Sequence, residues 1–144
     1  MVTREEIRKR IQDDDVQYLL VQIVDLNGSP KVKMVPAAHL DDVIDAGAGF
    51  TGAALPGLGQ GPHSHDMMAR IDLDSYTPIP WMPGVARFAA DLFVDGESYP
   101  FCARTNLKRV LDAARTEGFV FNVGMEPEHF LVTRTDDGIR VWDP

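Results

Sequence analysis

Apolar and polar positions follow strand-like and helix-like periods in separate segments of the chain. Residues 16–26 are almost continuously apolar, as expected for a central strand, and Asn27-Gly28 then gives a strong hairpin signal. Residues 31–35 alternate and predict the returning strand, which Pro36 ends. This alternation predicts two lysines facing outward and two apolar side chains facing inward, Lys31 and Lys33 and then Val32 and Met34.

Two short helices are predicted in the first part of the chain from their end signals. Thr3 and Glu6 form a capping box for the first helix, which stops at the three aspartates of residues 13–15. The second helix begins near Leu40 and closes at Gly47, a residue suited to the left-handed turn after a helix.

The clearest helix signal lies further along, over residues 105–117, with Thr105 or Asn106 as its cap and an apolar stripe on one face. Before it, residues 85–94 predict a strand that turns at Asp95-Gly96 into a tight hairpin. The earlier strand pair, residues 16–26 and 31–35, is followed by the short helix from Leu40 to Gly47 that packs across it, and this order indicates an α+β unit and not a doubly wound sheet.

Residues 51–62 break all periodicity, because four glycines and two prolines cannot form a regular element. Gly57 to Gly61 superficially resemble a dinucleotide-binding fingerprint, but the final glycine is lacking and Pro62 follows where a helix should begin. We therefore reject that interpretation. A long loop inside a compact chain is usually functional or disordered, and we expect this one to reach toward a ligand or a neighbouring subunit.

Residues 119–132 carry the most informative pattern, because their alternation predicts a strand with one apolar face. Glu126 and Glu128 fall on the other face, about 7 Å apart, where they could hold two hard cations or both ends of a phosphorylated ligand. His129 falls on the apolar face and is expected to pack in the core. The alternative is a solvated strand face with two ordinary glutamates.

Composition narrows the classes of function. The chain has 144 residues, 44% of them hydrophobic, enough for one core or for one small domain plus part of another. A formal net charge of −8 argues against a nucleic-acid or anionic-membrane surface, which needs basic patches.

The single Cys102 cannot form an internal disulfide, and a cytoplasmic protein is expected. His63-Ser64-His65-Asp66 has the spacing of a metal chelate, but a polar loop is the favoured interpretation.

Several short blocks occur in an order that resembles a known family. The blocks are Val24-Asp25-Leu26-Asn27-Gly28, Lys31 to Pro36, Phe50-Thr51-Gly52-Ala53-Ala54, Gly57-Leu58-Gly59-Gln60-Gly61-Pro62, Asp66-Met67, Asp72, Pro80-Trp81, Asp95-Gly96 through Arg104, and Gly124-x-Glu126-x-Glu128-x-Phe130. Together they resemble the N-terminal third of the glutamine synthetase family, and most closely its type III-like and γ-glutamylmethylamide synthetase subgroup. The combination is specific, whereas no single block is.

This resemblance implies an α+β fold in three parts. Residues 1–15 would form an N-terminal helix, and residues 16–100 a β-grasp-like domain. Residues 101–144 would supply the opening helix and strands of a glutamine synthetase catalytic domain, which is incomplete within this chain.

The resemblance also implies an activity. Enzymes of this family are ligases that activate the γ-carboxylate of glutamate with ATP, and ammonia or a small primary amine then attacks the γ-glutamyl phosphate. They bind two Mg²⁺ or Mn²⁺ ions, and at the matching positions Glu126 resembles a ligand of the ion nearer ATP and Glu128 a ligand of the ion nearer glutamate. The other metal ligands and the residues that bind ATP would lie beyond residue 144. Residues 1–144 alone, as a fragment or truncated gene product, are therefore expected to be inactive.

Members of this family build each active site between two subunits of a ring-shaped homo-oligomer, and the loop after the position of Phe50 is lent to the neighbour. Ordinary glutamine synthetases carry Asp at the position of Thr51, where it binds ammonium and takes its proton. Thr51 has no charge for this role, which leaves the identity of the amine open. The alternative, from another class, is a stand-alone non-catalytic β-grasp module for assembly or binding.

Overall fold

A mixed sheet of seven strands forms the body of the protein in the computed structural model, which describes residues 1–142. The strands are β1 Tyr18–Val24, β2 Pro30–Pro36, β3 Ala48–Phe50, β4 Met67–Ile71, β5 Thr77–Pro78, β6 Val85–Val94 and β7 Glu97–Ser98. The main path has the order β2-β1-β6-β4-β3, and the short β5 and β7 also pair with β6. Strands β1 and β6 run parallel, whereas the other pairs are antiparallel. The α+β expectation is confirmed.

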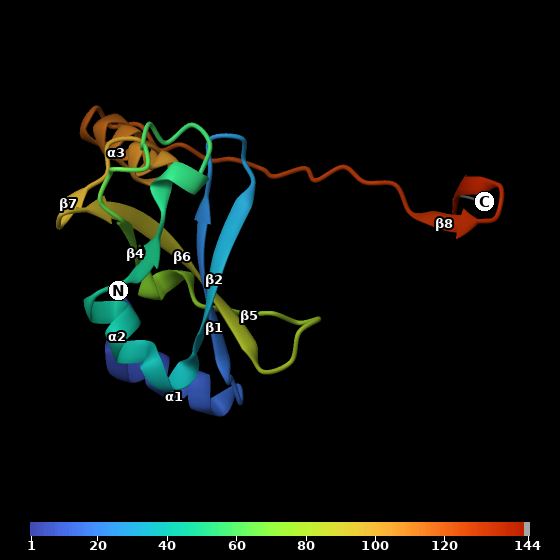
Figure 1. Ribbon diagram of the computed structural model, residues 1–144, viewed down its shortest axis with the longest axis horizontal. Coiled ribbons are helices and arrows are strands. Elements are labelled where there is room, and N and C mark those ends of the chain that lie inside the picture. The colour runs from blue at the N-terminus through green and yellow to red at the C-terminus, as the bar shows by residue number, and fades with distance from the viewer. Residues whose placement is uncertain (143–144) are drawn as a thin grey trace.

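Within residues 1–142, three α-helices accompany the sheet: α1 Arg4–Asp13, α2 Leu40–Asp45 and α3 Ala103–Thr116. The 3₁₀ helices are η1 Ala37–His39, η2 Gly52–Ala54 and η3 Leu73–Ser75. Figure 1 shows α1 and α2 at one end of the sheet and α3 at the other. The predicted capping box is confirmed, because the Thr3 hydroxyl accepts the amide of Glu6 and the Glu6 carboxylate accepts the amide of Thr3.

Two buried clusters cover one face of the sheet. In the first, Ile7 of α1 and Leu40 of α2 pack with Leu19 of β1 and Phe88 of β6. The second cluster continues along the same strands and includes Val21, Ile23, Ala90, Leu92, Met67, Leu55 and Leu58. The core therefore extends from the two N-terminal helices to the glycine-rich loop, residues 51–62.

The β1–β2 hairpin lies where the sequence predicts it, but the predicted faces of β2 are wrong. The register pairs Lys33 with the buried Val21, so Lys33 and Lys31 lie on the core side of the strand. Val32 and Met34 have exposed fractions of 49% and 51%. The reason is the curvature of the sheet, which brings its two edge strands close enough for Lys33 of β2 to donate to the carbonyl of Gly49 in β3 at 2.7 Å.

Strands β3 and β4 are not predicted by the sequence pattern. Strand β3 is only three residues long and contains a glycine, which gives it no period to detect. In β4 the long polar Arg70 interrupts the apolar run, and the structure places its guanidinium 4.3 Å from the centre of the Phe93 ring. Strand β4 depends on pairing with β6, and β3 in turn depends on pairing with β4, so both need contacts between separate parts of the chain.

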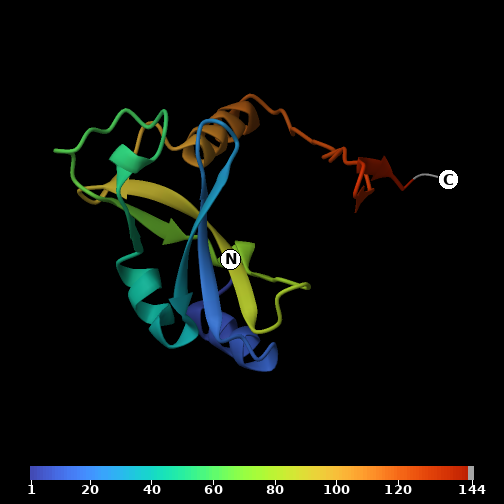
Figure 2. The same ribbon diagram turned by 45° about the vertical axis from the view of Figure 1, so that its right-hand side comes forward.

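The strand predicted over residues 119–132 is not formed. Among the described residues, 119–131 belong to no strand, and β8 Val132–Thr135 pairs with β9 Gly138–Val141 in a separate hairpin. Figures 1 and 2 show this segment leaving the body after α3 as an extended arm. A strand needs a neighbour to satisfy its backbone hydrogen bonds, and no described strand lies beside the arm. Its apolar side chains are accordingly exposed.

Helix α3 begins slightly earlier than predicted. Its N-cap is Cys102, without a side-chain capping bond, so the prediction of Thr105 or Asn106 as the cap is wrong. Asn106 already lies inside the first turn, where its side-chain Nδ2 donates to the carbonyl of Pro100 at 2.9 Å. Cys102 is 4% exposed and joins the core, which fixes the start of the helix beside the sheet.

Candidate functional site

Thr51 lies at the end of β3, where the chain leaves the sheet and enters η2. The residue is exposed, and its carbonyl accepts the amide of Ala54 at 3.0 Å. Behind it, β3 is held by β4 and by Lys33 of the opposite edge strand. Thr51 is therefore presented to solvent from a backbone that is fixed on both sides.

The glycine-rich loop is anchored at several points and is not a free segment. Leu55 and Leu58 have exposed fractions of 9% and 1%, and the Tyr99 hydroxyl donates to the carbonyl of Leu58. Gly57 has a φ of +82°, and a Cβ at this position would lie 2.6 Å from a methyl carbon of Leu26. The prediction of an irregular loop is confirmed apart from the single turn of η2, and the loop packs against the tip of the β1–β2 hairpin.

Asp25 at this hairpin tip is a residue whose importance the sequence interpretation missed. It is 3% exposed, and its carboxylate accepts the amides of Asn27 and Ser29 at 2.9 and 3.0 Å. The Lys31 ammonium lies 3.4 Å away. The hydrogen bond from the Ser29 amide is the main cause that lowers the pKa of Asp25. An aspartate two residues before Asn-Gly is a typical start of such a turn, and this signal could have identified it.

The histidine-rich segment after the loop makes a local contact. His65 Nδ1 lies 2.7 and 2.9 Å from the two carboxylate oxygens of Asp95 in the β6–β7 turn. This hydrogen bond raises the pKa of His65. Within residues 1–142, no three His, Cys, Asp or Glu side chains come together as a metal site. The contact that the structure gives this segment is thus the one between His65 and Asp95.

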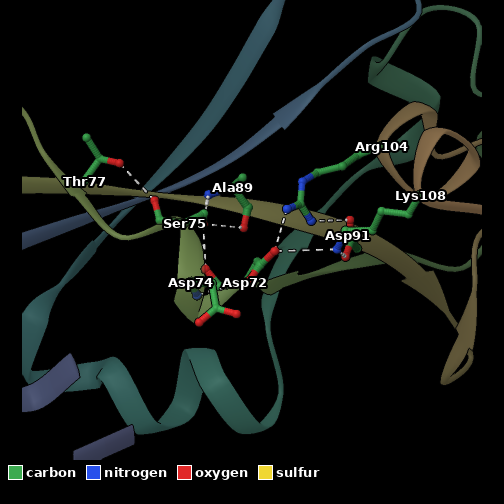
Figure 3. Close-up of polar contacts among 8 residues, drawn as sticks. All are labelled: Asp72, Asp74, Ser75, Thr77, Ala89, Asp91, Arg104 and Lys108. Carbon is green, nitrogen blue, oxygen red and sulfur yellow. Dashed lines mark hydrogen bonds and ion pairs between the residues drawn. The ribbon is translucent and has the colours of Figure 1, made fainter. Parts of the chain in front are cut away.

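A network of four charges joins α3 to the sheet, as Figure 3 shows. Arg104 of α3 donates to Asp91 of β6 at 2.8 Å and to Asp72 at 2.5 Å. Lys108, one turn further on, donates to Asp91 at 2.6 Å. Burial alone would lower the pKa of Arg104, but its hydrogen bonds to the two carboxylates raise it. Burial alone would raise the pKa of Asp72, but the hydrogen bond from Arg104 holds this pKa below its ordinary value.

Glu126 and Glu128 lie on the exposed arm. Their predicted strand is not formed, so the described residues do not hold the two carboxylates on one rigid face. His129 is exposed as well, and its prediction as a core histidine is wrong, because the arm packs against no described part of the protein. The structure thus brings Thr51 together with the glycine-rich loop and the hairpin tip, while the two glutamates lie on the segment that leads away (Figure 1).

Comparison with curated proteins found clear relatives, although no family model matches the chain. A glutamate–methylamine ligase from Methyloversatilis universalis is 37% identical over 140 residues, which cover 96% of this chain and 32% of the relative. A glutamine synthetase from Staphylococcus aureus is 38% identical over 141 residues, covering 94% of this chain and 31% of that enzyme. The chain therefore spans about a third of the length of these relatives.

Solved structures give the same result. A GmaS/ADP complex superposes with a TM-score of 0.73 at 32% identity, over 77% of this chain and 26% of the other. GmaS without ligand superposes with a TM-score of 0.72, over 81% of this chain and 27% of the other. No helix within residues 1–142 has the length and apolar character needed to cross a membrane. The chain is thus a homologue of the glutamine synthetase family ligases along nearly all of its length, and it corresponds to their N-terminal region.

Proposed function

We propose that this chain is the N-terminal part of an ATP-dependent carboxylate–amine ligase. The enzyme forms a γ-glutamyl amide from glutamate and ammonia or a small primary amine, through a γ-glutamyl phosphate. The observation that carries this proposal is the 37% identity to a glutamate–methylamine ligase over 140 residues. The superposition on a GmaS complex with ADP supports a nucleotide-dependent reaction.

The three parts of the chain have different tasks in this proposal. Residues 1–15 cover the core, residues 16–100 form a β-grasp-like domain, and residues 101–144 open the catalytic domain. The boundary near residue 100 is supported by the change of architecture between β7, which still pairs with the sheet, and α3, whose residues are all at least partly exposed.

Glu126 and Glu128 are the residues that we propose as ligands of Mg²⁺ or Mn²⁺. Their carboxylates are the hard oxygen donors that such ions prefer, and their spacing of two residues suits neighbouring ions on a strand. Two carboxylates are too few for either ion, so the remaining ligands would come from outside the described residues. When bound, the ions would neutralise negative charge on the phosphates. The contribution of this chain is to bring two carboxylates to that place.

Thr51 is proposed to lie at the amine site of a neighbouring subunit in a ring-shaped homo-oligomer in the cytoplasm. An exposed residue on a fixed turn at the edge of a sheet suits such a role, because it reaches a partner without moving its own domain. A neutral hydroxyl can orient an amine but cannot hold the positive charge of ammonium as a carboxylate does.

The test is an assay of the complete protein that contains this chain. With ATP, glutamate and methylamine or ammonia, it should release phosphate and form the γ-glutamyl amide, and hydroxylamine should trap the activated glutamate. The Glu126→Gln and Glu128→Gln variants should lose this activity, while Glu117→Gln, at the exposed end of α3, should keep it. Formation of no amide with any small amine would contradict the proposal.

A stand-alone, non-catalytic β-grasp module remains the second candidate, favoured by one observation. The body of the protein closes around its own two core clusters without using the arm. The reading frame decides between the two, because only the ligase requires residues beyond 144 with further metal and arginine motifs.

A further inference from the structure

Gly52, directly after Thr51, lies under the side chain of Gln60 from the other end of the glycine-rich loop. A Cβ at Gly52 would lie 1.7 Å from Gln60 Oε1 and 2.6 Å from Gln60 Cδ. The Gln60 carboxamide therefore occupies the space that a side chain at position 52 would need. Gly52 is required here for space and not for an unusual backbone angle, because it does not have a positive φ.

Gln60 Oε1 is buried and accepts no hydrogen bond from the described residues. A buried acceptor without a donor is unfavourable, so hydrogen bonding does not explain the position of this side chain. The close fit of the Gln60 side chain against Gly52 explains this position. The loop holds it there, because the backbone turns at Gly59, with a φ of +68°, and Tyr99 holds the carbonyl of Leu58.

The turn under Gln60 is the one that presents Thr51. The amide of Ala54 donates to the carbonyl of Thr51, and the amide of Leu55 donates to the carbonyl of Gly52, both at 3.0 Å. So short a helix as η2 is not stable by itself. The contact of Gln60 with Gly52 covers this turn, and its loss would leave the turn less stable.

We propose that Gln60 is a positioning residue for Thr51: its carboxamide covers Gly52 and fixes the turn that aims Thr51 at the amine. This inference rests on the proposed ligase function only for the role of Thr51. The contact between residues 52 and 60 can be tested without it.

The first experiment measures hydrogen exchange of the Ala54 and Leu55 amides in residues 1–144. Gln60→Ala removes the carboxamide, and Gly52→Ala displaces it with a methyl group, so each variant should accelerate exchange of both amides. In the double variant Gly52→Ala, Gln60→Ala, the new methyl group fills part of the vacated space, and exchange should return toward that of the wild type. If the two amides of the double variant exchange as fast as the added effects of the two single variants predict, the proposal is wrong.

The second experiment measures kinetics in the complete ligase. Gln60→Ala should raise the KM for the amine about tenfold or more, because small misplacements of a positioning group have effects of this size, and leave the KM values for ATP and glutamate unchanged. Gln60→Met keeps the length of the side chain without its carbonyl and should behave like the wild type. If Gln60→Met is as impaired as Gln60→Ala, Gln60 contacts the substrate directly and the proposal is wrong.

Gly61→Ala is the matched control for both experiments. It makes the same change in the same loop, but a Cβ at Gly61 would meet nothing within 4 Å. It should leave amide exchange and the KM for the amine unchanged, and an effect as large as that of Gly52→Ala would contradict the proposal. A wild-type ligase without activity would contradict the proposed function, whereas the exchange experiment would still decide whether Gln60 fixes the turn.

Discussion

By the resemblance described above, Thr51 lacks the charge of the aspartate that ordinary glutamine synthetases carry at the matching position. The structure gives Thr51 an exposed side chain on a backbone held by β4 and by the turn of η2. Substitutions here change the chemistry of the exposed group without disturbing the core. In the proposed ligase, position 51 is therefore the place to test the choice between ammonia and an alkylamine.

Thr51→Asp should shift the preference of the complete ligase toward ammonia. Ammonium must lose a proton before it attacks, and a carboxylate both attracts the cation and accepts this proton. A hydrogen bond to a charged group contributes about 1.5–3 kcal/mol, so the ratio of kcat/KM for ammonia over methylamine should rise roughly ten- to hundredfold. Thr51→Asn, which has nearly the same shape as Asp without its charge, is the control and should leave the ratio unchanged. A wild type that already favours ammonia, with no shift in Thr51→Asp, would show that Thr51 does not set the choice.

Asp25 should make the protein less stable in acid. Because its pKa is lowered in the folded state, its contribution is complete above the unfolded pKa of about 3.9 and is lost as the pH falls through the folded pKa. Asp25→Asn keeps acceptors for the two backbone amides but loses the attraction to Lys31. Urea unfolding at pH 7 and pH 3 should therefore show a smaller difference in midpoint for Asp25→Asn than for the wild type. Equal differences would mean that Asp25 is not coupled to folding.

At the scale of elements, α3 is attached by its charged face. Arg104 and Lys108 reach the carboxylates of the sheet, whereas the apolar stripe of the helix points away, with Leu107 and Val110 exposed by 56% and 60%. The glycine-rich loop is attached by apolar side chains instead, because its leucines are buried in the core. The two elements at this end of the sheet are thus held by different forces, ion pairs for α3 and apolar burial for the loop.

Leu58→Ala should destabilise the protein by about 2–5 kcal/mol, the usual cost of removing a fully buried leucine side chain. Leu107→Ala makes the same change on the exposed stripe of α3 and should alter the free energy of unfolding by no more than about 0.5 kcal/mol. Chemical denaturation followed by fluorescence or circular dichroism measures both. Similar losses in the two variants would show that the loop is not an anchored part of the core.

The elements that the sequence predicts correctly are those with local signals. The capping box of α1, the Asn-Gly hairpin and β6 each carry their own pattern, and the residue blocks from 24 to 130 identify the family. Strand β4, the inward lysines of β2 and the exposed arm depend on which distant segment lies alongside, and no local period reports that. The same holds at the candidate site, where Thr51 is identified by its motif but the contact of Gln60 with Gly52 is visible only in three dimensions.

At the scale of the whole molecule, the body and the arm differ in how much of them is buried. The sheet has its own core, whereas apolar residues along the arm, such as Phe121 and Met125, are exposed by 66% and 85%. Exposed apolar side chains in such number are typical of a surface that is covered by a partner. The proposed metal ligands Glu126 and Glu128 lie on this exposed arm and not on the buried body.

Residues 1–144 alone should therefore bind Mn²⁺ weakly at best and show no ligase turnover. Glu126 and Glu128 supply a minority of the oxygens that the ion needs. Calorimetric titration with MnCl₂ should give no saturation in the micromolar range, and the double variant Glu126→Gln, Glu128→Gln should give the same isotherm. Tight stoichiometric binding, or phosphate release that depends on ATP and glutamate, would contradict this expectation.

The central position of β6 has a consequence for the synthesis of the protein. Residues 18–22 of β1 pair with residues 85–89 of β6, and β4 pairs with residues 90–93 of the same strand. A nascent chain can close its first hairpin early, but β1 and β4 have no shared neighbour until β6 has left the ribosome. Pairing between strands so far apart in the sequence is slow, so the apolar side chains of β1 stay exposed to solvent during translation. A truncation before residue 94 would therefore release a chain that chaperones and proteases recognise as unfolded, and a pause there would prolong the exposure of β1.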